Sequence, residues 1–164
     1  MRRVVERWNA MLSRFARWLV SRPMLSEVAK PASRILAIVS QGPTRLLVQA
    51  VARDAGWSLT LSDTASALII QNTTDLPPVI IYDREVAPHT WREAVGVLTR
   101  HSPRPYVILL SAYTDPNLWD ELQRAGGCDI VRTPVSSDHL LEAVTMAWML
   151  WQSQQQVRSP SLRP

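Results

Sequence analysis

The sequence predicts an α/β domain in which a five-stranded parallel sheet carries helices on both faces. From about residue 34 onward, short β-rich apolar runs alternate with segments of helical periodicity. Strands separated by helices indicate right-handed βαβ crossovers that return to one sheet. A length of 164 residues, 46% of them apolar, suits one compact domain with extra segments at its ends.

The chain before this domain has the pattern of a basic amphipathic helix and a connector. Apolar residues recur over residues 2–21 at three- and four-residue steps, and arginines fill the positions between them. Pro23 ends this helix, and proline and small residues then favour an irregular connector. The predicted organisation is a helix and connector over residues 1–33, a domain over 34–156 and a flexible tail over 157–164.

Five segments of the domain have the composition of strands. Residues 34–39 and 106–110 are continuous apolar runs, typical of strands that are buried on both faces. Residues 57–61 alternate apolar and polar side chains, as a half-buried strand does. The predicted strands are residues 34–39, 57–61, 79–82, 106–110 and 129–132.

Turn and cap residues bound the helices between these strands. The Gly42-Pro43 turn opens the first helix of the domain and Gly56 closes it. Asp115-Pro116 supplies an N-cap and a first-turn proline. The predicted helices cover residues 44–55, residues 63–70 capped by Asp63, a segment carrying Trp91, Val95 and Leu98, the segment from Asp115 to Gly126-Gly127, and residues 137–155 capped by Ser136 or Ser137.

The net charge of +4 comes from outside the domain. Residues 1–33 carry +5, whereas residues 34–164 carry −1. The domain has no basic excess to attract a phosphate backbone, so we expect no nucleic-acid partner. The single cysteine excludes a disulfide framework and a Cys-based zinc site, and no apolar run reaches membrane-spanning length.

Small polar and acidic residues follow the strands of the predicted sheet. Ligands of doubly wound sheets bind beyond the carboxyl ends of the strands, so we expect a functional site at this edge. The residues there are Ser40 and Gln41 after the first strand, Asp83 after the third, Ser111 after the fourth and Thr133 after the fifth.

Three stretches at these strand ends resemble the receiver domain of bacterial two-component response regulators. They are VIIYD (79–83), VILLSAYTD (107–115) and AGGCDIVRTPVSSDHLLEAV (125–144), and the resemblance extends over residues 34–150. It implies a flavodoxin-like sheet of strand order 2-1-3-4-5 and a phosphorylation switch. It also implies that Asp83 occupies the phosphoacceptor position, with Ser111 and Thr133 at positions that contact the phosphoryl group.

This chain departs from the family at several of these positions. Ser40 and Gln41 stand where the family has the acidic pair that holds Mg²⁺, Thr133 stands at its lysine, and Ile130 at its switch aromatic. Phosphoryl transfer to a carboxylate needs cations that neutralise negative charge, and Mg²⁺ usually takes more than one carboxylate. We therefore expect a degenerate site in which Asp83 is vestigial and no cofactor is bound, with Mg²⁺ entering only if the site is functional.

Two nearby charged residues are candidates to compensate for these departures. Arg132 precedes Thr133, but adjacent strand residues point to opposite faces, so it cannot simply substitute for the lysine. Glu85 would return a carboxylate through the loop after Asp83. Phosphorylation of Asp83 with help from Glu85 or from a partner kinase is therefore kept as an alternative.

The sequence indicates no other chemistry. His89, His101 and His139 lie in separate segments without the spacing of metal ligands. There is no nucleophile elbow and no Gly-rich phosphate loop, and Cys128 has the setting of a packed small residue. We expect no catalytic residue and no enzymatic activity.

The two terminal helices are candidate interaction surfaces. Trp8, Phe15 and Trp18 with their flanking arginines suit either an anionic membrane surface or a seam with another helix. The last helix offers a partner surface, and we favour contact between the two helices, within one chain or in a homodimer, over membrane binding. An arginine-rich start also overlaps with organelle transit segments. The apolar residues of the last helix are Leu141, Val144, Trp148 and Trp151 on one stripe, and Met146, Met149 and Leu150 off it.

The sequence thus predicts a stand-alone pseudo-receiver domain in the cytoplasm that acts in two-component or phosphorelay signal transduction through protein–protein contacts. The expected partner is a signalling protein, either a histidine kinase or a downstream regulator. The alternatives are a phosphoaccepting response regulator that uses Asp83, and a membrane-surface adaptor that uses residues 1–22.

Overall fold

The computed structural model describes residues 34–64, 76–87, 89–113 and 116–158. The chain divides after Pro31 into two units, and all described residues lie in the second unit. The predicted N-terminal helix, with Trp8, Phe15 and Trp18, therefore falls outside the described residues. Of the helix predicted over residues 63–70, only Asp63 and Thr64 are described, and neither is helical.

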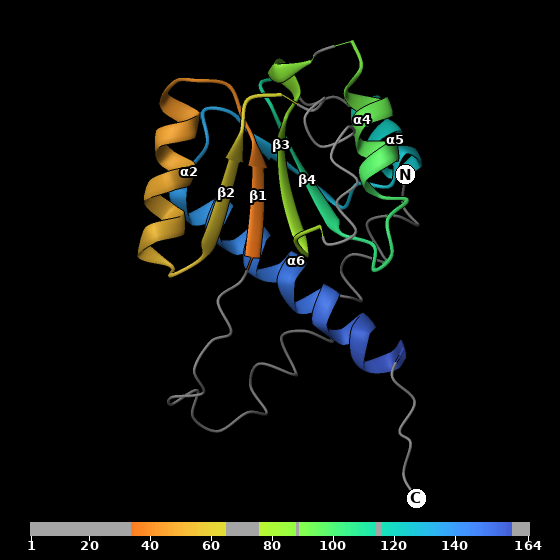
Figure 1. The fold of residues 1–164 in the computed structure, drawn as a ribbon. Helices are drawn as coiled ribbons and strands as arrows, with labels where there is room; N and C mark the ends of the chain where they lie inside the picture. Colours follow the sequence, from red (N-terminus) through yellow and green to blue (C-terminus); the bar gives the residue numbers. More distant parts are fainter. Residues whose placement is uncertain (1–33, 65–75, 88, 114–115, 159–164) are drawn as a thin grey trace, which may run out of the picture. The chain divides into compact units, whose positions relative to one another are not determined.

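Five parallel strands form one sheet in the order β2-β1-β3-β4-β5 (Figure 1). This is the predicted order, and each strand begins and ends within one residue of its predicted bounds. β2 lies on one side of β1 and β3 on the other, so the direction of winding reverses at β1. Ligands of such sheets bind at this reversal, beyond the carboxyl ends of the strands. The strands are β1 (Arg34–Ile38), β2 (Ser58–Ser62), β3 (Val79–Asp83), β4 (Tyr106–Ser111) and β5 (Asp129–Arg132).

Helices cover both faces of the sheet. Gly56 closes the first of them with a left-handed φ of +69°, and the Trp57 N–H donates to the Ala52 carbonyl at 2.8 Å. Ser136 begins the last helix, since its Oγ accepts the His139 N–H over 3.5 Å. The described helices are α2 (Pro43–Asp54), the 3₁₀ turn η1 (Arg84–Val86), α4 (Trp91–Leu98), α5 (Pro116–Ala125) and α6 (Ser137–Arg158).

Strand alternation divides the core into two layers. Along β4, Ile108 and Leu110 face α2 and α6, whereas Val107 and Leu109 face α4 and α5, and all four are fully buried. Burial on both faces explains why this strand is a continuous apolar run in the sequence. Figure 1 shows the two layers, with α2 on one side of the sheet and α4 and α5 on the other.

The buried face of α6 differs from the predicted stripe. Leu141 was predicted on that stripe but is 42% exposed, whereas the adjacent Leu140 is fully buried. Leu140 packs with Ala143, Val144 and Ala147 against the sheet. Val144 and Trp148 of the predicted stripe do pack there, so the buried face is widened toward Leu140 and the alanines, and only Leu141 turns away from it.

The remaining aromatic residues of α6 lie further along the helix. Trp148 packs against the core, and its ring stacks on that of Trp151 with centroids 5.6 Å apart. The α6 helix also reaches β4, because Gln154 Nε2 donates to the Tyr106 hydroxyl at 2.6 Å. Within the described ranges, no helix is both long enough and apolar enough to cross a bilayer.

Candidate functional site

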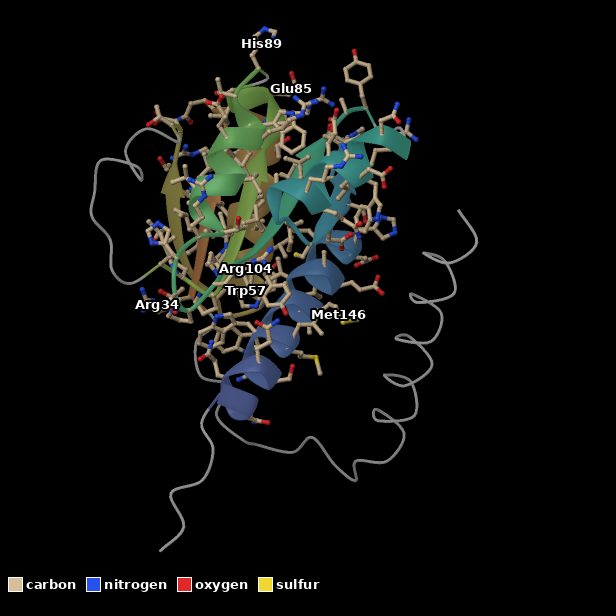
Figure 2. The ribbon with its side chains drawn as sticks, turned by 90° about the vertical axis from the view of Figure 1, so that its right-hand side faces the viewer. Arg34, Trp57, Glu85, His89, Arg104 and Met146 are labelled. Atoms are coloured by element: carbon tan, nitrogen blue, oxygen red, sulfur yellow. The ribbon has the colours of Figure 1, made fainter. Side chains whose placement is uncertain are left out.

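The residues predicted at the carboxyl edge of the sheet come together there in the structure. Asp83 ends β3 opposite Leu110, and Ser111 ends β4 opposite Arg132. The Thr133 N–H donates to the Ser111 carbonyl at 3.0 Å, which fixes the exit of β5 beside β4. Figure 2 shows Glu85 and His89 at this end of the sheet, and Arg34 and Trp57 toward the other.

Asp83 is a buried carboxylate that caps the turn after it. Its side chain is only 6% exposed, and Oδ1 accepts the Glu85 N–H at 3.0 Å. The Ser40 N–H is a second backbone donor to the carboxylate. These donors join the exits of β1 and β3 through one side chain.

Burial raises the pKa of Asp83 above its ordinary value. The Glu85 carboxylate raises that pKa further, while the N–H groups of Glu85 and Ser40 lower it. The net direction is upward, so desolvation outweighs the two hydrogen bonds. Burial therefore makes the charged form of Asp83 less favourable than that of an exposed carboxylate.

Ser111 is fully buried, and its hydroxyl is committed to a local turn. Oγ donates to the Tyr113 carbonyl at 2.7 Å and accepts the Tyr113 N–H at 3.3 Å. Tyr113 itself is 72% exposed. The hydroxyl proton is therefore used within the loop after β4.

Arg84 is a cation at this edge that the sequence analysis missed. Its Nη1 donates to Ser111 Oγ over 3.4 Å, while Arg132 is exposed and makes no such contact. The 3₁₀ turn that starts at Arg84 explains this, because it bends the chain back over the strand ends. An arginine directly after Asp83, at a strand exit, is the sequence signal that points to it.

A second arginine lies against the exit of β1. Arg45, in the first turn of α2, donates through Nη1 to the Val39 carbonyl over 3.4 Å. That carbonyl belongs to the same peptide group as the Ser40 N–H, which donates to Asp83. One amide therefore lies between a guanidinium and a carboxylate.

The other predicted site residues supply no cation at this edge, and Glu85 is the one further carboxylate among them. Gln41 is exposed and Thr133 is half-buried, and both are neutral. Glu85 is exposed, although its backbone contacts Asp83. Across the ranges that the structure describes, no three His, Cys, Asp or Glu side chains gather as a metal site would require.

The remaining candidates occupy ordinary positions. His89 and His139 are exposed and His101 is half-buried, each in a different loop or helix. Cys128 Sγ contacts the Val107 carbonyl at 3.2 Å, and burial raises the pKa of its thiol. Ile130 packs at the margin of the layer beneath α4 and α5.

Asp83→Asn is expected to stabilise the protein at neutral pH, with a rise in Tm of about 2–5 °C. Because burial raises the folded-state pKa of Asp83, the fold prefers the neutral carboxyl. The free energy of unfolding therefore decreases as pH rises from the ordinary carboxyl value of 3.8 through the raised pKa. Asparagine stays neutral throughout and still accepts the Glu85 N–H.

Thermal denaturation of both proteins, at neutral pH and below the ordinary carboxyl pKa, measures this effect. The difference in Tm is expected to disappear at the lower pH, where Asp83 is protonated in both the folded and the unfolded chain. The matched control is Asp120→Asn, which removes an exposed carboxyl in α5 and should leave Tm unchanged. A lower Tm for Asp83→Asn at neutral pH would show that the hydrogen bonds outweigh the cost of burial.

The comparisons with known proteins give a fold and no sequence family. No protein-family model matches the chain, and no curated protein matches it in sequence. Solved structures do match it. The chemotaxis response regulator CheY4 of Vibrio cholerae aligns 98% of its length with 70% of this chain, at 20% identity and a TM-score of 0.63.

Two further solved structures give the same result. The signal receiver domain of an HD domain-containing protein from Pseudomonas fluorescens aligns 98% of its length with 81% of this chain, at 16% identity and a TM-score of 0.69. A response regulator from Thermotoga maritima aligns 97% of its length with 71% of this chain, at 19% identity and a TM-score of 0.60. The chain therefore has the flavodoxin-like fold of response regulator receiver domains.

Proposed function

We propose that this protein is a receiver-like domain that acts in two-component or phosphorelay signalling through protein–protein contacts, without Mg²⁺-dependent phosphorylation of Asp83. Support for the signalling role comes from the fold that it shares with response regulators. Support for the silent site comes from one observation. Asp83 is a single buried carboxylate whose neighbours at the adjoining strand exits are neutral.

Electrostatics supports the proposed absence of Mg²⁺ binding. The ion takes hard oxygen ligands and gives up its water reluctantly, so a site without substrate phosphate usually offers several carboxylates. Asp83 already accepts two backbone N–H groups, and Ser40 and Gln41 add no charge. An incoming phosphoryl group would also find no ammonium at Thr133. Both partners of the reaction would carry negative charge, and neither Ser40, Gln41 nor Thr133 neutralises it.

Arg84 favours a second candidate, a phosphoaccepting response regulator. Its guanidinium reaches the hydroxyl of Ser111, which the family resemblance places at a phosphoryl-contact position. Arginine pairs well with phosphoryl oxygens in a bidentate geometry. In this candidate, Arg84 would supply the cation that Thr133 lacks.

Incubation with acetyl phosphate and Mg²⁺, followed by intact mass measurement, separates the two candidates. We expect the wild-type chain to gain no phosphoryl group. A receiver domain of known activity serves as the positive control under the same conditions. Phosphoryl addition that is lost in both Asp83→Asn and Arg84→Gln would overturn the proposal and establish the second candidate.

The proposal also includes the expected partner proteins. The contact would be with a histidine kinase or a downstream regulator, in the cytoplasm where such proteins meet receiver domains. We further propose that residues 2–21 pack against a helix, in the same chain or in a homodimer, rather than on a membrane surface. Trp148 and Trp151 of α6 are the candidate contacts for that helix.

A further inference from the structure

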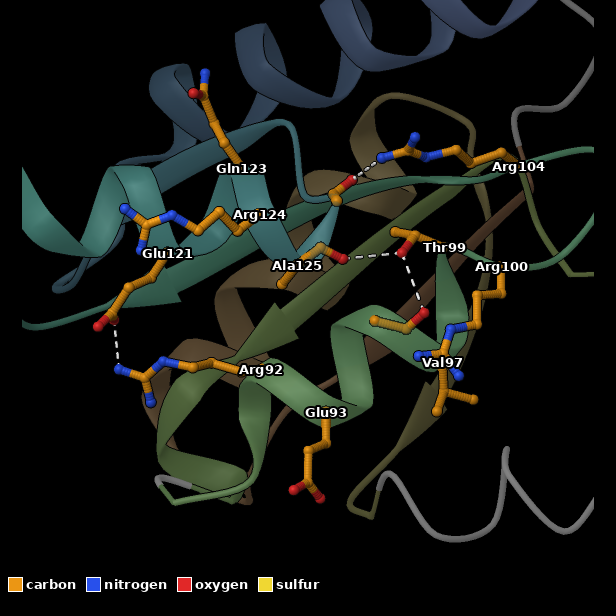
Figure 3. Close-up of a pocket in the computed structure, with 12 residues that line it drawn as sticks. Arg92, Glu93, Val97, Thr99, Arg100, Arg104, Glu121, Gln123, Arg124 and Ala125 are labelled. Atoms are coloured by element: carbon orange, nitrogen blue, oxygen red, sulfur yellow. Dashed lines mark hydrogen bonds and ion pairs between the residues drawn. The ribbon is translucent and has the colours of Figure 1, made fainter.

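A groove of about 960 Å³ runs between α4 and α5, on the face of the sheet away from α2 and α6 (Figure 3). Its positive residues gather at the amino ends of the strands. Arg100 follows the end of α4, Arg104 lies just before β4, and Arg124 is in the last turn of α5. Figure 2 places Arg104 toward the end of the sheet opposite Glu85, and therefore away from the Asp83 edge.

The groove concentrates positive charge on a domain that otherwise lacks it. Four arginines and two glutamates line it. Arg92 and Glu121 neutralise each other in an ion pair, which leaves three arginines against Glu93. Residues 34–164 as a whole carry −1, so this positive charge is a local feature.

At the end of the groove that holds Arg104, hydrogen bonds join the carboxyl ends of α4 and α5, and we call these contacts the clasp. Thr99 Oγ1 lies 2.9 Å from the Val95 carbonyl and 3.0 Å from the Ala125 carbonyl, so its one proton is shared between α4 and α5, and Arg104 Nη2 donates to the Gly126 carbonyl at 2.6 Å. Gly126 has a left-handed φ of +97°, and a Cβ there would lie 2.6 Å from Thr99 Oγ1. These contacts satisfy the last carbonyls of α5 and hold the two helix ends at a fixed separation.

Two guanidinium groups beside this clasp are available to a ligand. Arg100 and Arg124 are exposed, and within the described part of the chain neither is in an ion pair. They project from the two walls of the groove, on either side of the clasp (Figure 3). Two exposed positive side chains on either side of a hydrogen-bonded base give a surface that attracts anionic groups.

The side chains that line the groove favour one class of anionic partner over others. Among the described residues that line the groove, none is aromatic, so nucleic-acid bases would find no stacking surface. Valine and alanine are its largest apolar contributions, which suits neither a lipid chain nor an apolar helix face. Guanidinium groups pair with carboxylates in bidentate geometry, and Asp and Glu are the anionic groups that an unmodified protein segment carries. We propose that this groove binds an acidic, Asp- and Glu-bearing segment of a partner protein; the inference rests on the proposed function and names the chemistry of its partner.

Fluorescence anisotropy of a short fluorescein-labelled peptide of alternating Asp and Glu tests the inference on the full chain. We expect saturable binding that weakens as NaCl is raised to roughly 0.5 M. The double variant Arg100→Ala/Arg124→Ala is expected to weaken binding about tenfold. The matched control is Arg53→Ala/Arg132→Ala, which removes the same charge from exposed positions outside the groove and should change affinity less than about twofold.

The other outcomes overturn the inference. Equal weakening by both double variants would mean general charge attraction rather than a groove, and absence of binding would remove the site. A DNA duplex that binds more tightly than the peptide, with the same dependence on Arg100 and Arg124, would make nucleic acid the occupant. Phosphorylation of Asp83 would overturn the proposed function while leaving the peptide result intact, so the two failures are distinguishable.

Discussion

Leu140→Ala is expected to lower the free energy of unfolding by roughly 3 kcal/mol, while Leu141→Ala is expected to cost less than about 0.5 kcal/mol. The two leucines are adjacent in α6, and the substitution is the same. Leu140 is fully buried against the sheet, so its truncation leaves a cavity, whereas Leu141 is 42% exposed. Helix propensity changes equally in both variants and cancels in the comparison.

Urea denaturation of the three proteins measures the difference. With an unchanged m-value, the Leu140→Ala midpoint should shift far below that of the wild type, and the Leu141→Ala midpoint should coincide with it. Equal losses at both positions would mean that another surface covers Leu141 in solution. Residues 2–21 would then be the first candidate for that surface, because they are predicted to pack against a helix.

Charged side chains placed at positions 40, 41 and 133 are expected to create an Mg²⁺ site. In Ser40→Asp/Gln41→Asp/Thr133→Lys, Mg²⁺ affinity should rise at least about tenfold, which corresponds to roughly 1.4 kcal/mol. The two new carboxylates follow β1 beside Asp83, whose hydrogen bond from the Ser40 N–H already places this loop against it. The new ammonium would follow β5, next to Ser111.

Isothermal titration with MgCl₂ and intact mass after acetyl phosphate treatment check this prediction. The control Ser40→Asn/Gln41→Asn/Thr133→Met changes the same positions without adding charge and should behave as the wild type. Asp83→Asn in the restored background should abolish both signals. A restored chain that binds no Mg²⁺ would contradict the charge argument and would point instead to the hydrogen bonds that hold Asp83 and Ser111.

Much of the fold was predictable because local signals agree with one another. The run 106–110 is apolar throughout since β4 is buried on both faces, and Gly56 ends α2 with the backbone conformation that glycine favours. The face of α6 was predicted wrongly at Leu141. That helix is apolar nearly all round, so periodicity carries little information, and close packing of Ala143 and Ala147 decides which leucine is buried.

The candidate site was predictable only in part. Strand ends place Asp83 and Ser111 at one edge whatever their chemistry, so their positions follow from the topology. An arginine directly after Asp83 indicates a cation near this edge, but its contact with Ser111 depends on a tight turn of three residues that periodicity does not predict. The groove between α4 and α5 joins residues more than twenty positions apart, and only packing of the two helices brings them together.

The peptide plane between Val39 and Ser40 is polarised from both ends, by Arg45 at its oxygen and Asp83 at its hydrogen. The start of α2 and the end of β3 therefore both meet the chain at one amide of the β1 exit, which lies between a positive and a negative side chain.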